Sequence, residues 1–180
     1  MRLAPLPAEE WDDEVVGSLR GFLPRARQNP DGAGNAMSTM VHHPALTKAF
    51  MPLNLHLLFS STLDPRLREL AILRVAHRRE SPYEWAHHTS MAKMLGVTDD
   101  EIESVRRGEA ADDFDRLVLA AVDELDDNNG LTDETWTALG ERLDERQRMD
   151  LIFTVGTYNM LAMAFNTFGV QLDQAGEVTH

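Results

Sequence analysis

The sequence predicts an all-α fold built as a single helical domain. Apolar residues recur at helical spacing along most of the chain, and no segment alternates apolar and polar residues for long enough to indicate a strand. Helix start and stop signals separate these apolar stretches. A chain of 180 residues, 43% hydrophobic and 26% charged, is long enough to bury one core.

The N-terminal third is expected to hold one amphipathic helix, a loop and a longer helical region. Apolar residues at four-residue steps predict a helix over 11–23, which ends before Pro24. A loop rich in Gly and Asn over 28–35 then breaks the chain. The region 36–60 is apolar enough to be a largely buried helix. Two prolines are expected to restart or kink it, namely Pro44 and Pro52.

The middle of the chain carries clearer punctuation. Asp64 as N-cap and Pro65 at the first helical position begin a helix that runs to about Arg79. Ser81 begins the next helix, and Glu84 follows it three residues later in the pattern of a capping box. Two helices therefore follow each other closely in this segment.

The remaining helices follow the same logic. Gly96 ends the helix that begins at Ser81, and a second capping box opens a short helix over 98–108. We expect further helices over 112–127 and around Trp136. The last helix, 144–169, is apolar nearly all round, so it must lie inside the domain or between subunits.

The organisation that we predict has three parts. An N-terminal helix and loop cover 1–36, and the main helical domain covers 37–170, with its central motif at 64–108. The residues 171–180 read as a loose tail.

Composition excludes several function classes. The formal charge of −13 and the pI near 4.8 repel phosphate backbones, and no Lys/Arg cluster stands out to reverse this locally, so nucleic acid is not expected as a partner. No apolar run reaches the ~18 residues of a membrane span, and no signal-peptide core is present, so we expect a cytoplasmic protein with no membrane partner. The absence of cysteine excludes disulfides, thiolate metal sites, iron–sulfur clusters and thiol chemistry.

The candidate site is the segment that opens the helix at Ser81. It places Glu84, His87 and His88 within two helical turns, and Glu69 stands on the preceding helix. Carboxylates and imidazoles are the side chains that most often act as general acids and bases. If the protein does chemistry, we expect it here.

Glu69 shares its predicted helix face with apolar side chains. Desolvation there would raise the pKa of Glu69 and make it a proton donor, unless a cation compensates. The alternative is a structural ion pair with Arg74 or another Arg across the core. The exposed positions of this helix are expected to be Arg68, Arg78 and Arg79.

Glu84 has two readings. As the third helical residue after Ser81, it could simply accept a backbone N–H in a capping box. Alternatively, it could meet His88 or His87 on one helix face, where the helix dipole would keep the carboxylate ionised and the imidazole could exchange a proton.

This part of the chain resembles the carboxymuconolactone decarboxylase and alkylhydroperoxidase D superfamily. The resembling segments are Leu67–Ala76, Tyr83–His88 and Met94–Ile102. The family pattern is a Glu, then a Cys-x-x-Cys pair at a helix start, then a His four residues after the second Cys. Glu69 matches the Glu and His88 matches the His, whereas Ser81 and Glu84 stand where the two cysteines would be.

The resemblance implies an all-helical, single-domain bundle of the alkylhydroperoxidase D-like type, with helices packing across subunits of a homotrimer or homohexamer. It also places the site near a subunit boundary. Peroxide reduction in the family needs the thiol pair, which this chain lacks. The decarboxylase branch instead performs cofactor-free acid/base chemistry on a lactone acid, which a Glu/His site could support.

We therefore expect a cofactor-free enzyme that moves protons during decarboxylation, isomerisation or elimination of a small organic acid or lactone. In this scheme Glu84 is the general base, His88 the shuttle or acid, and Glu69 the protonated partner. Tyr83 and His87 are expected to orient the small-molecule substrate.

Two alternatives remain open. Glu69, Glu84 and His88 could form a metal site, since two carboxylates and one imidazole suit a hard divalent ion. The chain could also be a non-catalytic oligomeric binding protein, in which Glu69 is ion-paired and no pocket reaches Glu84. Whether His42 and His43 join the site from a neighbouring subunit is a further open point.

Overall fold

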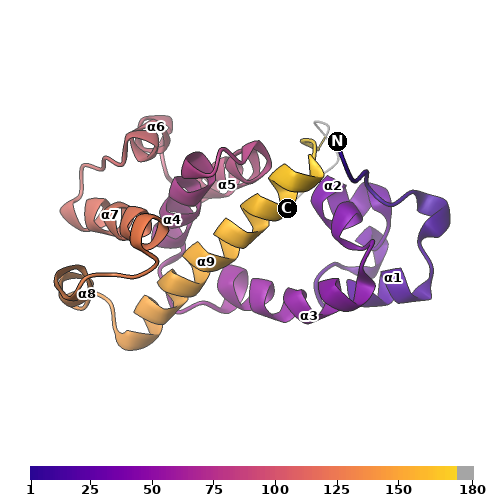
Figure 1. Ribbon diagram of the computed structural model, residues 1–180, viewed down its shortest axis with the longest axis horizontal. Coiled ribbons are helices and arrows are strands. Elements are labelled where there is room, and N and C mark those ends of the chain that lie inside the picture. Colours follow the sequence, from indigo (N-terminus) through magenta and orange to yellow (C-terminus); the bar gives the residue numbers. More distant parts are fainter. Residues whose placement is uncertain (174–180) are drawn as a thin grey trace. The chain divides into compact units, whose positions relative to one another are not determined.

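The computed structural model describes residues 1–173, and it contains helices and turns but no strand within that range. In chain order the elements are η1 (Ala8–Glu10), α1 (Asp13–Ser18), η2 (Arg25–Arg27), α2 (Pro30–Met40), α3 (Pro44–Leu55), the π-helical η3 (His56–Ser60), α4 (Pro65–Arg78), α5 (Pro82–Met94), α6 (Asp99–Arg107), α7 (Asp113–Asn128), α8 (Asp133–Leu139) and α9 (Glu145–Phe168) (Figure 1). The all-α prediction is confirmed, whereas packing across subunits stays a prediction.

Contacts within the chain divide it into two compact units. One unit contains residues 1–59 and the described residues from 164 onward, and the other contains residues 60–163. The helix α9 begins in the second unit and ends in the first. The boundaries that the sequence suggested at residues 36 and 170 stay predictions, and residues 174–180 of the expected tail lie outside the described residues.

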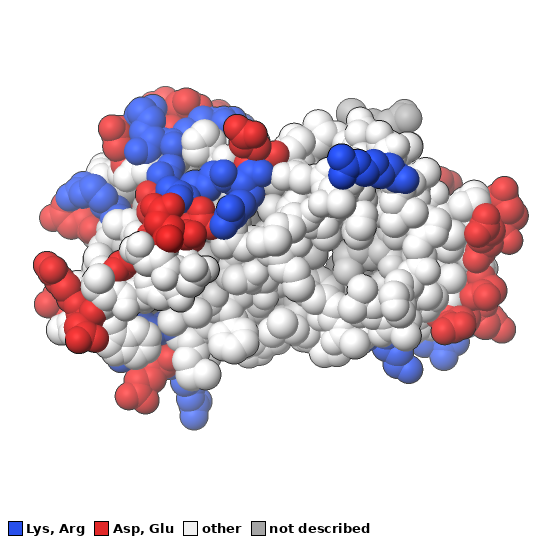
Figure 2. Space-filling model, viewed as in Figure 1, with Lys and Arg blue, Asp and Glu red and all other residues white. Residues whose placement is uncertain are grey.

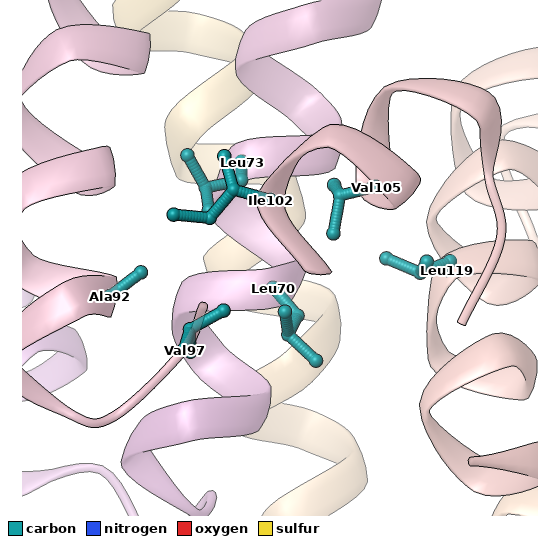
Figure 3. Packing of buried hydrophobic residues seen from close by; sticks show 7 residues of the cluster. All are labelled: Leu70, Leu73, Ala92, Val97, Ile102, Val105 and Leu119. Atoms are coloured by element: carbon teal, nitrogen blue, oxygen red, sulfur yellow. The ribbon is translucent and has the colours of Figure 1, made fainter. Parts of the chain in front are cut away.

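The unit of residues 60–163 is built around α4, which contacts α5, α6 and α7 (Figure 1). Every residue of α4 from Arg68 to Ala76 is buried, because neighbours cover the helix on more than one side. Its apolar side chains meet those of α5, α6 and α7 in one cluster (Figure 3). The cluster consists of Leu70, Leu73, Ala92, Val97, Ile102, Val105 and Leu119.

Burial of α4 on all sides corrects one expectation. Arg68 was predicted to be exposed, but only 7% of it is accessible to solvent. The apolar face of α4 is wider than the sequence spacing indicates, and the charged side chains on the helix must therefore find partners inside the protein.

The capping predictions for the middle of the chain are mostly confirmed. The side chain of Asp64 accepts hydrogen bonds from the N–H groups of Arg66 and Leu67 at the start of α4. Thr98 and Glu101 form both halves of a capping box at the start of α6. Local signals of this kind are readable in the sequence because both partners lie within one turn.

The turn from α4 into α5 is tight and has a fixed geometry. Glu80 adopts a left-handed backbone conformation with φ of +49°. The N–H of Ser81 then donates to the carbonyl of Ala76 at 2.9 Å. This six-to-one hydrogen bond ends α4 in the manner of a Schellman motif and sets the direction of α5.

The unit that contains residues 1–59 departs from prediction at two places. The first helix, expected over 11–23, is only α1, because the chain leaves helical geometry at Leu19 and turns through Gly21 at φ of +83°. The expected loop over 28–35 is largely helical, since α2 begins at Pro30. The core of this unit gathers Leu6, Val15, Leu19, Ala33 and Val41.

A helix that crosses a membrane must be both long and apolar. None of the helices within residues 1–173 meets both conditions.

Candidate active site

The centre of the candidate site is Glu69 on α4, whose side chain is fully buried. Its Oε2 lies 2.6 Å from Nδ1 of His88 on α5. Its Oε1 accepts a hydrogen bond of 3.0 Å from Nε of Arg68. The sequence indicated both residues as candidates but not whether they meet in space, and the structure joins them directly.

The charge state of Glu69 follows from these contacts. Burial by itself would raise the pKa of Glu69, but the hydrogen bonds and charges of His88 and Arg68 outweigh it and hold the pKa below its ordinary value. Glu69 is therefore ionised at neutral pH, and the expectation that it is the protonated partner is wrong. The reason is the direct contact with His88, to which the buried Arg68 adds a smaller contribution.

The tautomer of His88 follows in turn. An ionised carboxylate only accepts hydrogen bonds, so Nδ1 of His88 carries the hydrogen and donates it to Glu69. The imidazole is thereby oriented, and Nε2 is the nitrogen that can exchange a proton with a substrate.

Glu84 lies on α5, one turn before His88. Unlike Glu69, it holds its proton at neutral pH. Only 2% of Glu84 is exposed, and neither carboxyl oxygen has a hydrogen-bond partner among residues 1–173. Burial raises the pKa of Glu84 to about 8. The nearby hydroxyl of Ser81 lowers this pKa, but its geometry does not meet that of a hydrogen bond to Glu84. At neutral pH Glu84 is protonated, so it is a proton donor and not the ionised base that we expected.

Two expected contacts of Glu84 are absent from the described residues. The side chain of Ser81 makes no capping bond, and the Ser81 N–H that Glu84 would accept is already bonded to Ala76. The capping-box prediction is therefore wrong at this helix, because the Schellman turn uses the N–H first. The predicted pair of Glu84 with His88 is not formed either, since His88 turns its Nδ1 to Glu69.

Tyr158 of α9 is the residue of this region that the sequence did not reveal. Its ring stands edge-on to the ring of His88, with centroids 4.8 Å apart and planes at 90°. Burial first, then the negative charge of Glu69, and then the charge that Glu84 acquires at high pH, raise the pKa of Tyr158 well above its ordinary value. Tyr158 is 70 residues from His88 in the chain, so no local spacing could have pointed to it.

The other histidine and tyrosine candidates have local contacts. Tyr83 and His87 stack on each other along α5, with ring centroids 4.3 Å apart, and their role in orienting a substrate stays a prediction. In the other unit, Nε2 of His42 bonds to the carbonyl of Ala4, and Nδ1 of His43 accepts from the N–H of Leu46 at the start of α3. Both imidazoles therefore stabilise the chain near them.

A metal site would require three ligand side chains grouped around one point. Within the described part of the chain, no three His, Asp or Glu side chains are grouped so that they could hold a metal ion. Glu69, Glu84 and His88 are therefore not arranged as a ligand set.

A pocket of about 750 Å³ lies at the start of α5. Ser81 and Trp85 contribute to its wall, but Glu69, Glu84 and His88 do not. In a single chain the two carboxyl groups are thus closed off from this pocket.

The arrangement pairs two buried carboxyl groups whose surroundings shift their pKa values in opposite directions. The ionised Glu69 orients an imidazole that can accept a proton, and the protonated Glu84 can donate one. Such a separation of pKa values is how proteins assign acid and base roles to two similar side chains. Acid/base chemistry is therefore what these residues can perform.

A family model matches the part of the chain that contains these residues. The model of the Carboxymuconolactone decarboxylase family matches residues 44–127, which include α4, α5 and α6. A search of the curated proteins found no match to this chain.

Solved structures share the fold. The alkylhydroperoxidase AhpD core of an uncharacterized peroxidase-related protein from Ralstonia eutropha JMP134 matches with a TM-score of 0.78 and 14% identity, over 97% of this chain and 94% of that chain. A peroxidase-related protein from Silicibacter sp. TM1040 matches with a TM-score of 0.72 and 14% identity, over 98% and 95%. A variant of the debrominase Bmp8 in complex with 2,3,4-tribromopyrrole gives a TM-score of 0.72 and 17% identity, over 97% and 93%.

Proposed function

We propose that this chain, whose residues 44–127 match the model of the Carboxymuconolactone decarboxylase family, is a cofactor-free acid/base enzyme acting on a small organic acid or lactone. The single observation that carries this proposal is that Glu69 is ionised and Glu84 is protonated at neutral pH, although both side chains are buried. Thiol peroxidase chemistry is not open to this chain, because it contains no cysteine.

The chemistry assigns a role to each group. In a decarboxylation, the bond between carbon and the carboxylate breaks, carbon dioxide leaves, and the electron pair stays on the carbon. The carboxyl proton of Glu84 then adds to that carbon, and solvent returns a proton to Glu84. In an isomerisation, Nε2 of His88, oriented by Glu69, removes a proton before Glu84 delivers one.

A panel of small lactone acids and unsaturated dicarboxylic acids tests the proposal, with carbon dioxide release and ultraviolet absorbance as readouts. We expect turnover of at least one acid by the wild type, and a loss of about a hundredfold or more in Glu84→Gln. Because the protonated form is the active one, the rate should fall as the pH rises through about 8.

The matched control is Glu109→Gln, which changes an exposed carboxylate paired with Arg107 and should leave the rate unchanged. If the wild type turns over none of these acids, or if Glu84→Gln is as fast as the wild type, the enzyme proposal is wrong.

A non-catalytic oligomeric binding protein is the second candidate function. The observation that favours it is the closed state of the site: Glu69 is ion-paired, and the oxygens of Glu84 are buried without partners. An enzyme needs a route by which substrate reaches Glu84, whereas a binding protein does not. The turnover panel therefore separates the two functions.

We also propose that the protein forms a homotrimer or homohexamer through α9. Between Met149 and Met163, the helix exposes apolar side chains at alternating steps of four and three residues, and the surface along most of α9 is uncharged (Figure 2). Such spacing is typical of a seam at which helices pack. The seam residues are Met149, Phe153, Gly156, Met160 and Met163, and a Cβ added at Gly156 would meet no atom within 4 Å.

Phe153→Glu should therefore dissociate the oligomer, because it places a charge in the middle of the seam. Light scattering after size-exclusion chromatography would measure the change in mass. Arg107→Gln is the control, since Arg107 is exposed on α6 and not on α9, and this change also shifts the net charge by one unit. A wild type that is already monomeric at micromolar concentration would contradict the proposal.

A further inference from the structure

The pocket at the start of α5 is lined by three helices of one unit. The last turns of α4, the first turn of α5 and the end of α6 meet around a volume of about 750 Å³, which is within the range of small-molecule sites. The lining includes Arg74, His77, Arg78, Ser81, Trp85 and Arg106.

This wall contains three arginines and one acidic residue, Glu80, although the chain as a whole carries a formal charge of −13. The sequence indicated no basic cluster here, because Arg106 comes from a different helix and meets the arginines of α4 only in the fold.

The three arginines are not equivalent. Arg74 makes two hydrogen bonds of 2.7 Å to the carboxylate of Asp123, and Arg78 pairs with Asp126 at 2.8 Å, so both are neutralised from outside the pocket. Arg106 instead has one ion pair, from Nε to Glu103 at 3.1 Å, with 38% of its side chain exposed. Arg106 is thus the guanidinium best placed to bind an added anion.

An aromatic surface accompanies this guanidinium. The central carbon of the Arg106 guanidinium lies 3.8 Å from the centroid of the Trp85 ring, which fixes its plane. The ring of His77 stands edge-on to Trp85 at 6.1 Å. The pocket therefore combines an oriented cation with a flat apolar wall, which is what a small acid with a carbon skeleton requires.

Ser81 supplies a second and independent observation. It is part of the pocket wall and only 1% exposed, and its hydroxyl has no hydrogen-bond partner within the described residues. It is also the N-cap residue of α5 and makes no capping bond, so the positive end of the helix dipole has no side-chain acceptor there. The hydroxyl oxygen is itself closed to solvent and acts on the pKa of Glu84, so the uncapped start of the helix, and not this hydroxyl, is what Ser81 leaves available to an anion.

We propose that this pocket binds the carboxylate of a small organic acid, with the carboxylate on Arg106 and the carbon skeleton against Trp85. This inference rests on the proposed function and names its substrate-binding region. Ser81 belongs to the pocket wall, and its hydroxyl also acts on the pKa of Glu84, so the pocket and the proton donor have this residue in common.

The electrostatics at His77 support the proposal. Burial first, and then the charges of Arg74 and Arg106, lower the pKa of His77. The positive charges of the two arginines therefore act on the pKa of His77 more strongly than the negative charge of Glu103. At this position in the wall, the electrostatic potential favours an anion.

The test is a titration of the full-length protein with benzoate, followed by the indole N–H signal of Trp85 in ¹H–¹⁵N NMR spectra. The chain has three tryptophans, and the spectrum of Trp85→Phe assigns the signal. We expect a saturable shift with benzoate and none with its neutral methyl ester. Arg106→Gln should weaken benzoate binding about tenfold, and Arg106→Lys should weaken it less.

Arg107→Gln is the matched control, because Arg107 is the next residue of α6, pairs with Glu109 and does not line the pocket. Benzoate affinity should be unchanged in this variant. The proposal is overturned if benzoate gives no saturable shift, if the methyl ester binds equally well, or if inorganic phosphate binds more tightly than benzoate.

The experiment also distinguishes this inference from the proposed function. Glu84→Gln leaves the pocket wall intact, so it should bind benzoate like the wild type whether or not the protein turns over any acid. Normal binding together with an absence of turnover would retain the pocket and reject the enzyme.

Discussion

Replacing Glu69 by alanine is expected to lower the free energy of unfolding at pH 7 by about 3–5 kcal/mol, which is the usual cost of removing one partner from a buried ion pair. The carboxylate contacts both Arg68 and His88, and all three side chains are at least nine-tenths buried. Removing it takes the counter-charge from a guanidinium that has little access to water. Urea denaturation at pH 7 measures the loss.

The pH dependence gives an independent check on Glu69. Its folded-state pKa lies below the ordinary value of 4.5, so the charged form is the one that folding favours. The stability that it contributes is present above pH 4.5 and is lost as the pH falls through the folded pKa. Glu69→Gln should therefore flatten the acid limb of the stability curve.

Glu109→Ala serves as the control for an exposed pair. Its partner Arg107 is also largely exposed, and pairs of this kind contribute at most about 1 kcal/mol. A loss in Glu69→Ala no larger than that in Glu109→Ala would mean that the buried cluster is not held as described.

Replacing Glu84 by glutamine is expected to have the opposite effect and to stabilise the protein. Folding requires Glu84 to be protonated, because burial raises its pKa to about 8. In the unfolded chain the group ionises near its ordinary pKa of 4.5. Each pH unit between these values costs about 1.4 kcal/mol, so the neutral glutamine should gain roughly 3 kcal/mol at pH 7.

The sign of the pH dependence follows from the raised pKa. The native state holds a proton that the unfolded state has lost, so wild-type stability should fall as the pH rises from about 4.5 to about 8. Glu84→Gln should remove this slope. Thermal unfolding of both proteins across this pH range measures it.

The exposed neighbour Glu80 provides the control, and Glu80→Gln should change stability by less than about 0.5 kcal/mol. If Glu84 were only a helix cap, Glu84→Gln would bring no such gain, because a capping box accepts glutamine as well as glutamate at this position. A loss in place of a gain would thus reject the charge state on which the proposed function rests.

The features that sequence reasoning predicted well are those with a local cause. The N-cap at Asp64, the capping box at Thr98 and the left-handed Gly96 and Gly108 each depend on residues within one helical turn. Their signals are therefore complete in a short stretch of sequence.

The errors arose where distant residues decide the outcome. Glu69 stays ionised because His88, and to a smaller extent the buried Arg68, contact it, whereas burial without such partners keeps Glu84 protonated. The swapped roles of the two carboxyl groups follow from these contacts, which spacing along a helix does not show. Tyr158 and Arg106 were missed for the same reason.

The tight turn between α4 and α5 also has a consequence for folding. Glu69 and His88 are separated by only 19 residues, and the two helices that carry them are consecutive. Contacts between near neighbours in the chain have a small loop-closure cost and form early. The Glu69–His88 bond can therefore assemble as soon as this helical hairpin closes, before α9 brings Tyr158 into place.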